Sequence, residues 1–344
     1  MKVVTLGEMM IRFMPAGNRR FEQAESFEAY YGGDECIVAC SLARFGAHSV
    51  YLTKLPRNPL GDICLQKLRA QGVDTSQIVR GGERLGLNFY ENGAAVRPSS
   101  VLYDRSHSAI SEALPSEFDL DAAMEGADWF HFAGITPAIS DQAAELTRAA
   151  AQCARRHGVT VSCDLNYRSK LWSVEKAKEV MAGILPYVDV CIGGLEDADR
   201  MIGLESLKVQ QGSFNHSRAE YEAAFRELTE RFGFRMMLST LREGANSSEN
   251  TWAALLYDGR DFYETTRYTI HLVDRGGGGA SCSAAFIYGV LSGFDLAKTG
   301  EFAVAASALK QTITGDLNLV NLDEVYSLME GKGRGRVSRS GENQ

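Results

Sequence analysis

Short apolar runs typical of β-strands alternate with helical stretches along most of this chain. The strand-like runs cover residues 3–6, 49–54, 129–132, 159–164, 188–192 and 235–240, and the helical stretches cover residues 36–45, 59–70, 141–156, 174–185, 218–231 and 280–292. This alternation predicts an α/β fold in which helices cover both faces of a doubly wound, mostly parallel sheet. Ligand sites in such sheets lie at the carboxyl ends of the strands.

Two segments, residues 11–31 and 84–102, interrupt the alternation because they read as short strands and turns without a helix. They are predicted to pair as a small antiparallel sheet, which could close over the main site as a lid or form a dimer surface. We therefore expect an α/β core made of residues 1–10, 34–83 and 106–330. The β lid would comprise residues 11–33 and 84–105, and residues 331–344 would form a mobile tail.

The composition excludes several classes of function. The chain has 344 residues, of which 45% are apolar, and a formal net charge of −8, so it can bury a large core and is not expected to bind nucleic acid. No apolar stretch reaches the ~20 residues that a membrane span needs. The seven cysteines are odd in number and form no C-x-x-C pair, which indicates reduced, mostly buried thiols in a cytoplasmic protein.

Four consecutive glycines, residues 276–279, lead into a helical stretch of small residues. A glycine run before a helix offers backbone N–H groups and the positive end of the helix dipole to an anion such as a phosphate. A dinucleotide-binding fold would instead place its glycines directly after the first strand. The late position of this run argues against that alternative.

Several further stretches together resemble one family. They cover residues 21–33, 58–62, 103–105, 129–137, 164–168 with Leu171-Trp172, 273–275 and 314–319. In this order they resemble the ribokinase, or PfkB-type, carbohydrate kinases, and within them the 2-keto-3-deoxygluconate kinases, over about residues 2–340. The resemblance implies a ribokinase-like fold, ATP and Mg²⁺ as cofactors, and phosphoryl transfer to a hydroxyl of a small sugar acid.

The resemblance also assigns expected roles to individual residues. The anion hole would comprise Gly277, Gly278 and Gly279. The substrate-binding positions would be Gly33, Asp34, Ile37, Asn88, Tyr103, Arg105 and Arg168. The nucleotide-binding positions would be Gly194, Thr240, Arg242, Gly244 and Asn318, with Asp197 near the metal. The two substrate-site arginines would pair with the carboxylate of the acid, for which a guanidinium is suited; the alternative is that each forms a surface salt bridge or a salt bridge between elements of the fold.

The sequence departs from the family pattern at the site. The family places its catalytic base, an aspartate, where this chain has Ala280, and the loss of a general base typically costs ~10²–10⁴ in rate. Six other positions also differ: Asp34 replaces a small alanine, Ile37 an asparagine, Asn88 a tyrosine, Gly194 and Leu195 an asparagine and an acidic residue, and Cys282 a phenylalanine.

Changes at several site positions within a family-like scaffold favour a natural pseudokinase that acts by binding a ligand or a partner. A single Asp-to-Ala replacement would instead have suggested an engineered inactive variant. A homodimer is the expected assembly, and an active kinase paralogue is a further candidate partner. The alternatives are an active ATP-dependent kinase for 2-keto-3-deoxygluconate or a related acid, with a displaced base, and an assembly protein that uses only the scaffold.

Overall fold

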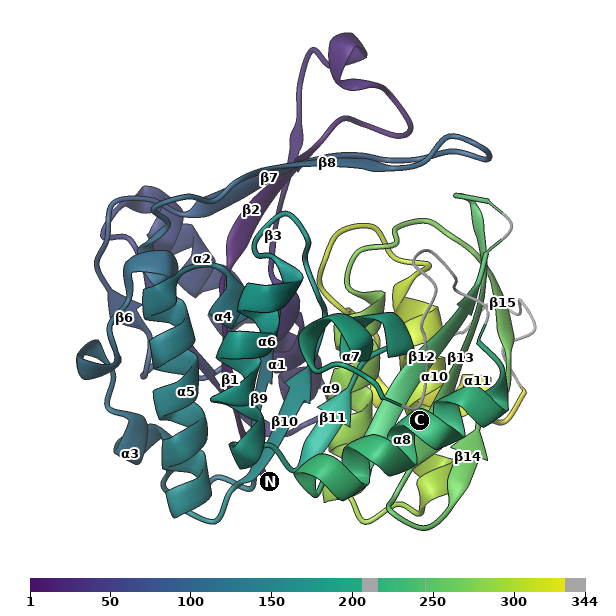
Figure 1. Cartoon of the computed structure of the whole chain (residues 1–344). Coiled ribbons are helices and arrows are strands. Elements are labelled where there is room, and N and C mark those ends of the chain that lie inside the picture. Colours follow the sequence, from purple (N-terminus) through teal and green to yellow (C-terminus); the bar gives the residue numbers. More distant parts are fainter. Residues whose placement is uncertain (206–215, 245, 332–344) are drawn as a thin grey trace, which may run out of the picture.

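The computed structural model describes residues 1–205, 216–244 and 246–331. The predicted tail therefore lies outside the described residues, apart from its first residue. The rest forms an α/β core beneath a projecting layer of strands (Figure 1). This is the predicted fold class.

Within the described residues the central sheet has nine strands, eight of them in the order β14-β13-β12-β11-β10-β9-β1-β4, with β15 also paired to β13. The strands are β14 (Phe262–Glu264), β13 (Glu249–Tyr257), β12 (Met236–Glu243), β11 (Val190–Ile192), β10 (Thr160–Asp164), β9 (Trp129–Ala133), β1 (Lys2–Leu6), β4 (His48–Leu52) and β15 (Tyr268–His271). Pairing is parallel from β4 to β12 and antiparallel where β13 meets β12, β14 and β15. The sheet is thus mostly parallel, as predicted.

Helices cover both faces of this sheet. One apolar cluster contains side chains of α3 (Leu120–Met124), α5 (Asp141–Arg156), α6 (Val174–Ala182), α7 (Leu195–Met201) and α8 (Arg218–Phe232). A second contains side chains of α1 (Asp34–Arg44), α9 (Gly278–Leu291), α10 (Leu296–Lys310) and α11 (Leu322–Met329). The neighbouring strand residues Val3 and Val4 belong to different clusters, because successive side chains of a strand point to opposite faces.

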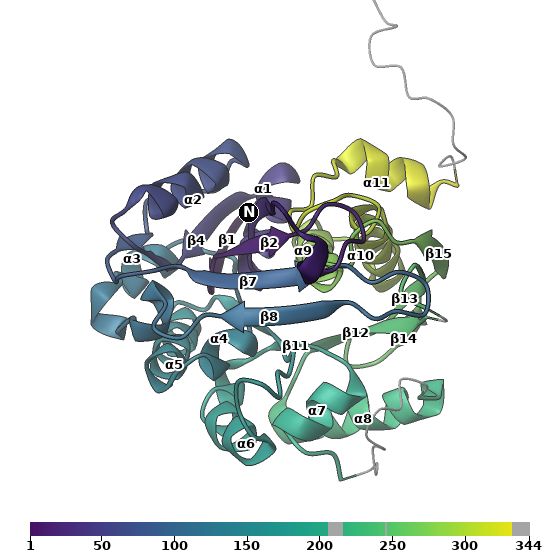
Figure 2. The ribbon, with the colours of Figure 1, turned by 90° about the horizontal axis from the view of Figure 1, so that it is seen from above.

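The layer above the core is a second sheet with the strand order β3-β2-β7-β8. Its strands are β3 (Glu28–Gly32), β2 (Met10–Met14), β7 (Gly86–Glu91) and β8 (Ser100–Asp104). Seen from above, β7 and β8 cross over the molecule (Figure 2). The prediction of an antiparallel sheet was wrong at one pairing: β2 runs parallel to β7, so the lid is mixed. After β2 and before β7, the chain returns through the core. Both strands can therefore enter the lid from the core and run in the same direction.

The remaining elements are short or lie at the edge of the core. They are α2 (Pro59–Ala70), α4 (Ile135–Ala138), the two-stranded sheet of β5 (Lys54–Leu55) and β6 (Val79–Arg80), and four 3-10 turns at Phe21–Gln23, Ala109–Glu112, Pro115–Glu117 and Leu185–Tyr187. All seven cysteines are buried and form no disulfide. In the described parts of the chain, no helix combines the length and apolarity needed to cross a bilayer.

One buried titratable group makes the stability of the core sensitive to acid. His131, in the central strand β9, is fully buried and its Nδ1 lies 2.7 Å from the Ser162 hydroxyl of β10. Burial lowers the pKa of His131 to about 3, so the neutral imidazole is the folded form. Because the unfolded chain takes up this proton at higher pH, His131 removes stability as the pH falls from about 6.5 toward 3.

We therefore expect His131→Asn, whose amide can still meet Ser162, to lose less unfolding free energy between pH 6.5 and 4 than the unmodified chain. Urea unfolding at several pH values measures this difference. The matched control is His271→Asn on the exposed β15 position, which should leave the pH dependence unchanged. Parallel pH curves for the unmodified chain and His131→Asn would contradict the expectation.

Candidate active site

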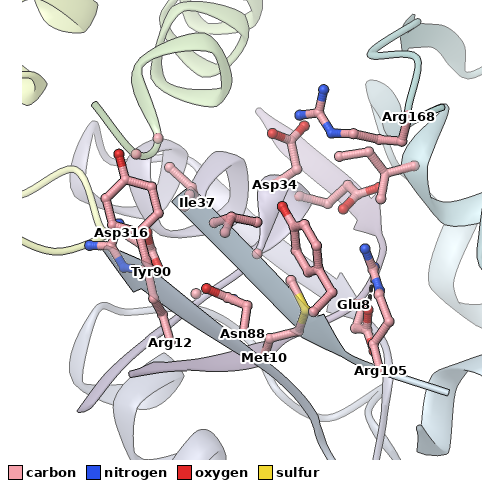
Figure 3. A pocket seen from close by; sticks show the side chains of 18 residues that line it. Glu8, Met10, Arg12, Asp34, Ile37, Asn88, Tyr90, Arg105, Arg168 and Asp316 are labelled. Atoms are coloured by element: carbon pink, nitrogen blue, oxygen red, sulfur yellow. Dashed lines mark hydrogen bonds and ion pairs between the residues drawn. The ribbon is translucent and has the colours of Figure 1, made fainter. Parts of the chain in front are cut away.

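A cavity of about 200 Å³ lies between the lid, the start of α1 and the glycine turn before α9 (Figure 3). All seven predicted substrate positions line it: Gly33, Asp34, Ile37, Asn88, Tyr103, Arg105 and Arg168. The turn residues Gly276 and Gly277 complete the wall, whereas Gly278, Gly279 and Ala280 do not line the cavity. Segments that are distant in sequence thus meet where the resemblance implied.

Gly33 allows two chain segments to cross at the base of the cavity. A Cβ at this position would lie 1.9 Å from the backbone oxygen of Glu8, which is far inside contact distance. Only glycine therefore lets the chain enter α1 beside the end of β1. This close crossing places Asp34, the first residue of α1, at the cavity wall.

The glycine turn is a backbone feature that requires glycine. Gly277 is the N-cap of α9 and has a φ of 78°, in the left-handed region. The helix begins at Gly278, two residues before the predicted start at Ala280, because small residues without branching can continue the turn. The first N–H groups of the helix have no acceptor within the helix and form the positive end of its dipole. The turn can therefore receive an anion.

Ala280 is the third residue of α9 and is 1% exposed. It belongs to the same apolar cluster as Ile37 and Cys282. Ile37 also reaches the glycine turn, since its Cδ1 would lie 3.2 Å from a Cβ on Gly277. Position 280, where the resemblance would place a catalytic base, thus continues the hydrophobic core toward the cavity, and neither Ala280 nor Ile37 can accept a proton.

A buried ion-pair network joins the lid to the glycine turn. Arg12 of β2 donates from Nη2 to Asp274 Oδ2 at 2.5 Å and from Nη1 to Asp274 Oδ1 at 3.2 Å. Its Nη1 also lies 3.2 Å from Asp316 Oδ1. Burial raises the pKa of Asp316, and the charge of Arg12 opposes that rise. The nearby Lys310 has a pKa lowered by burial to about 8.

Acidic groups gather beneath the other end of the cavity. Glu35 is buried and accepts hydrogen bonds from Ala133 N at 3.0 Å and Thr136 Oγ1 at 2.5 Å. Burial, followed by the negative charge of Asp34, raises the pKa of Glu35 to about 8. Burial and the charge of Asp34 likewise raise the pKa of Asp164 at the end of β10.

The two predicted carboxylate-binding arginines differ in their surroundings. Arg105 forms a buried ion pair with Glu8. Arg168 is exposed, and its Nη1 donates to the backbone oxygen of Tyr167 at 3.4 Å. Glu8 is the ion-pair partner that the sequence analysis missed, because 97 residues separate it from Arg105.

A second cavity, of about 360 Å³, lies beside the first and shares Arg168 with it. Of the predicted nucleotide and metal positions, Gly194, Thr240, Arg242 and Asp197 line it. Gly244 and Asn318 do not, so the structure does not bring the full predicted set together. Asn318 is fully buried, and its Oδ1 accepts a hydrogen bond from Val320 N at 3.1 Å. Its side chain therefore stabilises the turn in which it lies.

The sequence analysis missed other residues that line these cavities. They are Glu8, Met10, Arg12, Tyr90, Val101, Ile135 and Asp316 in the first cavity, and His216, Tyr221 and Trp252 in the second. A usable signal existed for two of them: Glu8 and Arg12 are charged residues within or next to apolar N-terminal strands. The aromatic residues of the second cavity carried no comparable signal.

The glycine crossing gives a testable contrast in stability. We expect Gly33→Ala to lower the unfolding free energy by about 1–3 kcal/mol or more, because the new Cβ meets a backbone oxygen. The matched control is Gly279→Ala, where a Cβ meets nothing within 4 Å and alanine favours the helix. Thermal melts of both variants decide the matter, and an unchanged melting temperature for Gly33→Ala would refute the steric argument.

Comparison with known proteins places the chain in a family. The model of the pfkB family carbohydrate kinases matches residues 1–320. The 2-dehydro-3-deoxygalactonokinase of Haloferax volcanii is 33% identical, covering 96% of this chain and 97% of that protein. The crystal structure of 2-dehydro-3-deoxygluconokinase from Thermotoga maritima is 44% identical with a TM-score of 0.92, covering 96% of this chain and 100% of that one. An Escherichia coli putative ribokinase II solved with ATP and Mg²⁺ shares the fold at 19% identity and a TM-score of 0.78, covering 96% and 99%. The chain belongs to the PfkB family of carbohydrate kinases and is similar to its 2-keto-3-deoxygluconate kinases.

Proposed function

We propose that this chain is a pseudokinase of the PfkB family that acts by binding a small sugar-type ligand and a nucleotide, without appreciable phosphoryl transfer. The observation that carries the proposal is the burial of Ala280 in an apolar cluster at the N-terminus of α9. By the family pattern this is the position of the group that takes the proton from the attacking hydroxyl. An apolar contact there leaves the reaction without its base.

The surrounding changes support the same conclusion. Ile37 stands where the family pattern has an amide and lies against the glycine turn. Ala280 and Ile37 belong to one cluster, so the two replacements extend the core together. A carboxylate restored at position 280 alone would face this apolar cluster without a hydrogen-bonding neighbour from α1.

Nucleotide binding is the part of the family's chemistry that the second cavity supports. Three buried polar atoms in its wall have no hydrogen-bond partner: Glu196 Oε1, His216 Nε2 and Trp252 Nε1. Burial, and then the positive charge of nearby Arg275, lower the pKa of Arg242 in the same wall. The Arg242 guanidinium and the Trp252 N–H can donate to a polyphosphate, whereas the Glu196 oxygen would need a bridging cation.

The carboxylates of Glu196 and Asp197 are the groups that would hold Mg²⁺, since oxygen ligands are those that Mg²⁺ prefers. Burial raises the pKa of Asp197 to about 6, so this carboxyl is largely ionised at neutral pH. The residues present therefore fit ATP with Mg²⁺. Bound there, the metal would neutralise phosphate charge.

A second candidate function is an active kinase with a displaced base. Asp316 favours it, because this carboxylate lines the first cavity next to the glycine turn and its pKa is raised by burial. Against it, Asp316 is already ion-paired with Arg12 at 3.2 Å. Loss of turnover in Asp316→Asn, together with an acid limb in the pH–rate profile, would identify this alternative.

The proposed function predicts the rates of turnover. In a coupled ADP-release assay with ATP, Mg²⁺ and either 2-keto-3-deoxygluconate or the neutral sugar 3-deoxy-D-fructose, we expect background rates from the unmodified chain and from Ala280→Asp. We expect the double variant Ala280→Asp with Ile37→Asn to exceed Ala280→Asp by at least about tenfold, because the new carboxylate then has a polar neighbour. The matched control is Ala280→Asn with Ile37→Asn, which lacks a base and should stay at background.

Two results would overturn the proposal. Turnover of roughly 1–100 s⁻¹ by the unmodified chain would show that a base is present. Full recovery by Ala280→Asp alone would show that the rest of the site has not been lost.

The proposed function also predicts that a nucleotide stabilises the chain. MgATP at 100 times its dissociation constant should stabilise the chain by about 2.7 kcal/mol in thermal unfolding. Arg242→Ala should weaken this stabilisation at a fixed MgATP concentration, because it removes a guanidinium group from the wall of the second cavity. The matched control is Arg260→Ala at an exposed position. No thermal shift at millimolar MgATP would favour the assembly-protein alternative.

A further inference from the structure

Asp34 brings a carboxylate into the first cavity at a position where the family pattern has a small alanine. It is the first residue of α1 and lines the cavity directly. Its Oδ2 is buried and has no hydrogen-bond partner. An unpartnered buried oxygen in a cavity wall is available to accept a hydrogen bond from a ligand.

Asp34 and Arg168 lie at the same end of the cavity (Figure 3). Burial raises the pKa of Asp34, whereas the positive charge of Arg168 and a hydrogen bond with Asn166 lower it. The arginine and the aspartate therefore interact electrostatically. A ligand carboxylate placed against Arg168 would lie close to the carboxylate of Asp34, and both would compete for the one positive charge. Two like charges brought close together repel each other.

Each of the other arginines in the cavity wall also faces a carboxylate. Arg105 is 8% exposed and pairs with Glu8, which is 3% exposed. Arg12 pairs with Asp316 at 3.2 Å and with Asp274. The wall thus contains three arginines and four acidic residues, Glu8, Asp34, Glu35 and Asp316, of which Glu35 has a pKa raised to about 8 and is mostly protonated at neutral pH. Arg12 and Arg105 thus each form an ion pair with a protein carboxylate, and the charge of Arg168 acts on Asp34.

We propose that this cavity selects a neutral polyhydroxy compound over the corresponding sugar acid, and that Asp34 is the residue that determines this selectivity. The proposal rests on the binding role given under Proposed function and departs from the sugar acids for which the relatives are named. Hydroxyl groups of a neutral ligand can donate to the carboxylates in the wall, and such charge-assisted hydrogen bonds are strong. A ligand carboxylate cannot donate, and it adds a further negative charge.

The test compares two compounds that differ at one end only. They are 2-keto-3-deoxygluconate and 3-deoxy-D-fructose, which carries a hydroxymethyl group in place of the carboxylate. Dissociation constants are measured by calorimetry without nucleotide, on the unmodified chain, Asp34→Ala and Asp34→Asn. Thermal melts of each variant confirm that it is folded.

We expect the unmodified chain to bind the neutral compound at least about tenfold more tightly than the acid. Both variants should shift the ratio of the two dissociation constants at least about tenfold toward the acid, since both remove the charge of Asp34. The matched control is Asp104→Asn, which removes one exposed carboxylate at the end of β8, paired with Arg84 outside the cavity. This control should leave the ratio unchanged.

Three results would overturn the proposal. The first is tighter binding of the acid by the unmodified chain. The second is a ratio that does not change in Asp34→Asn, which would mean that Asp34 is already uncharged in the folded protein. The third is no binding of either compound at millimolar concentration. These readouts contain no nucleotide, so a chain that proved to be an active kinase could still confirm the selectivity, and the two proposals can fail separately.

Discussion

The interaction on which the site depends is the set of hydrogen bonds around Asp274. Its Oδ1 accepts from Gly276 N at 2.8 Å, its Oδ2 accepts from Gly315 N at 2.9 Å, and both oxygens accept from Arg12. One buried carboxylate thus holds the glycine turn, the turn before Asp316 and the lid strand β2. Because removing one partner of a buried ion pair typically costs about 3–5 kcal/mol, this network fixes the lid over the helix N-terminus.

This framework is independent of the position of the family's base. Ala280 makes no contribution to the network and lies in the apolar cluster with Ile37. The turn is held by Asp274 and by the left-handed conformation of Gly277, and neither depends on the side chain at position 280. If the group for proton transfer has been lost, as we propose, the fold can still keep the glycine turn and the cavity beside it.

The sequence predicted local elements better than the contacts between distant ones. Helix α5 was predicted at its observed bounds because its pattern of apolar residues is a local signal, and in the structure the Ser140 side chain caps its first turn. The parallel pairing of β2 with β7 could not be predicted, since Met10 meets Gly86 only after the intervening chain has folded through the core. All seven substrate positions came from the resemblance and line one cavity, but Asn318 shows that a matching motif can serve a turn instead.

The two cavities differ in how the charges of their arginines are balanced, and this difference constrains what the chain can bind. In the wall of the second cavity, burial and then the positive charge of Arg275 lower the pKa of Arg242, and a bound anion would offset the repulsion between the two charges. In the first cavity, Arg105 pairs with Glu8, Arg12 pairs with Asp316, and the charge of Arg168 acts on Asp34. A polyphosphate would therefore gain electrostatic free energy from this protein, whereas a sugar carboxylate would gain little. On the proposals made above, Asp34, Ile37 and Ala280 would all change the chemistry of the site without altering the framework that holds it.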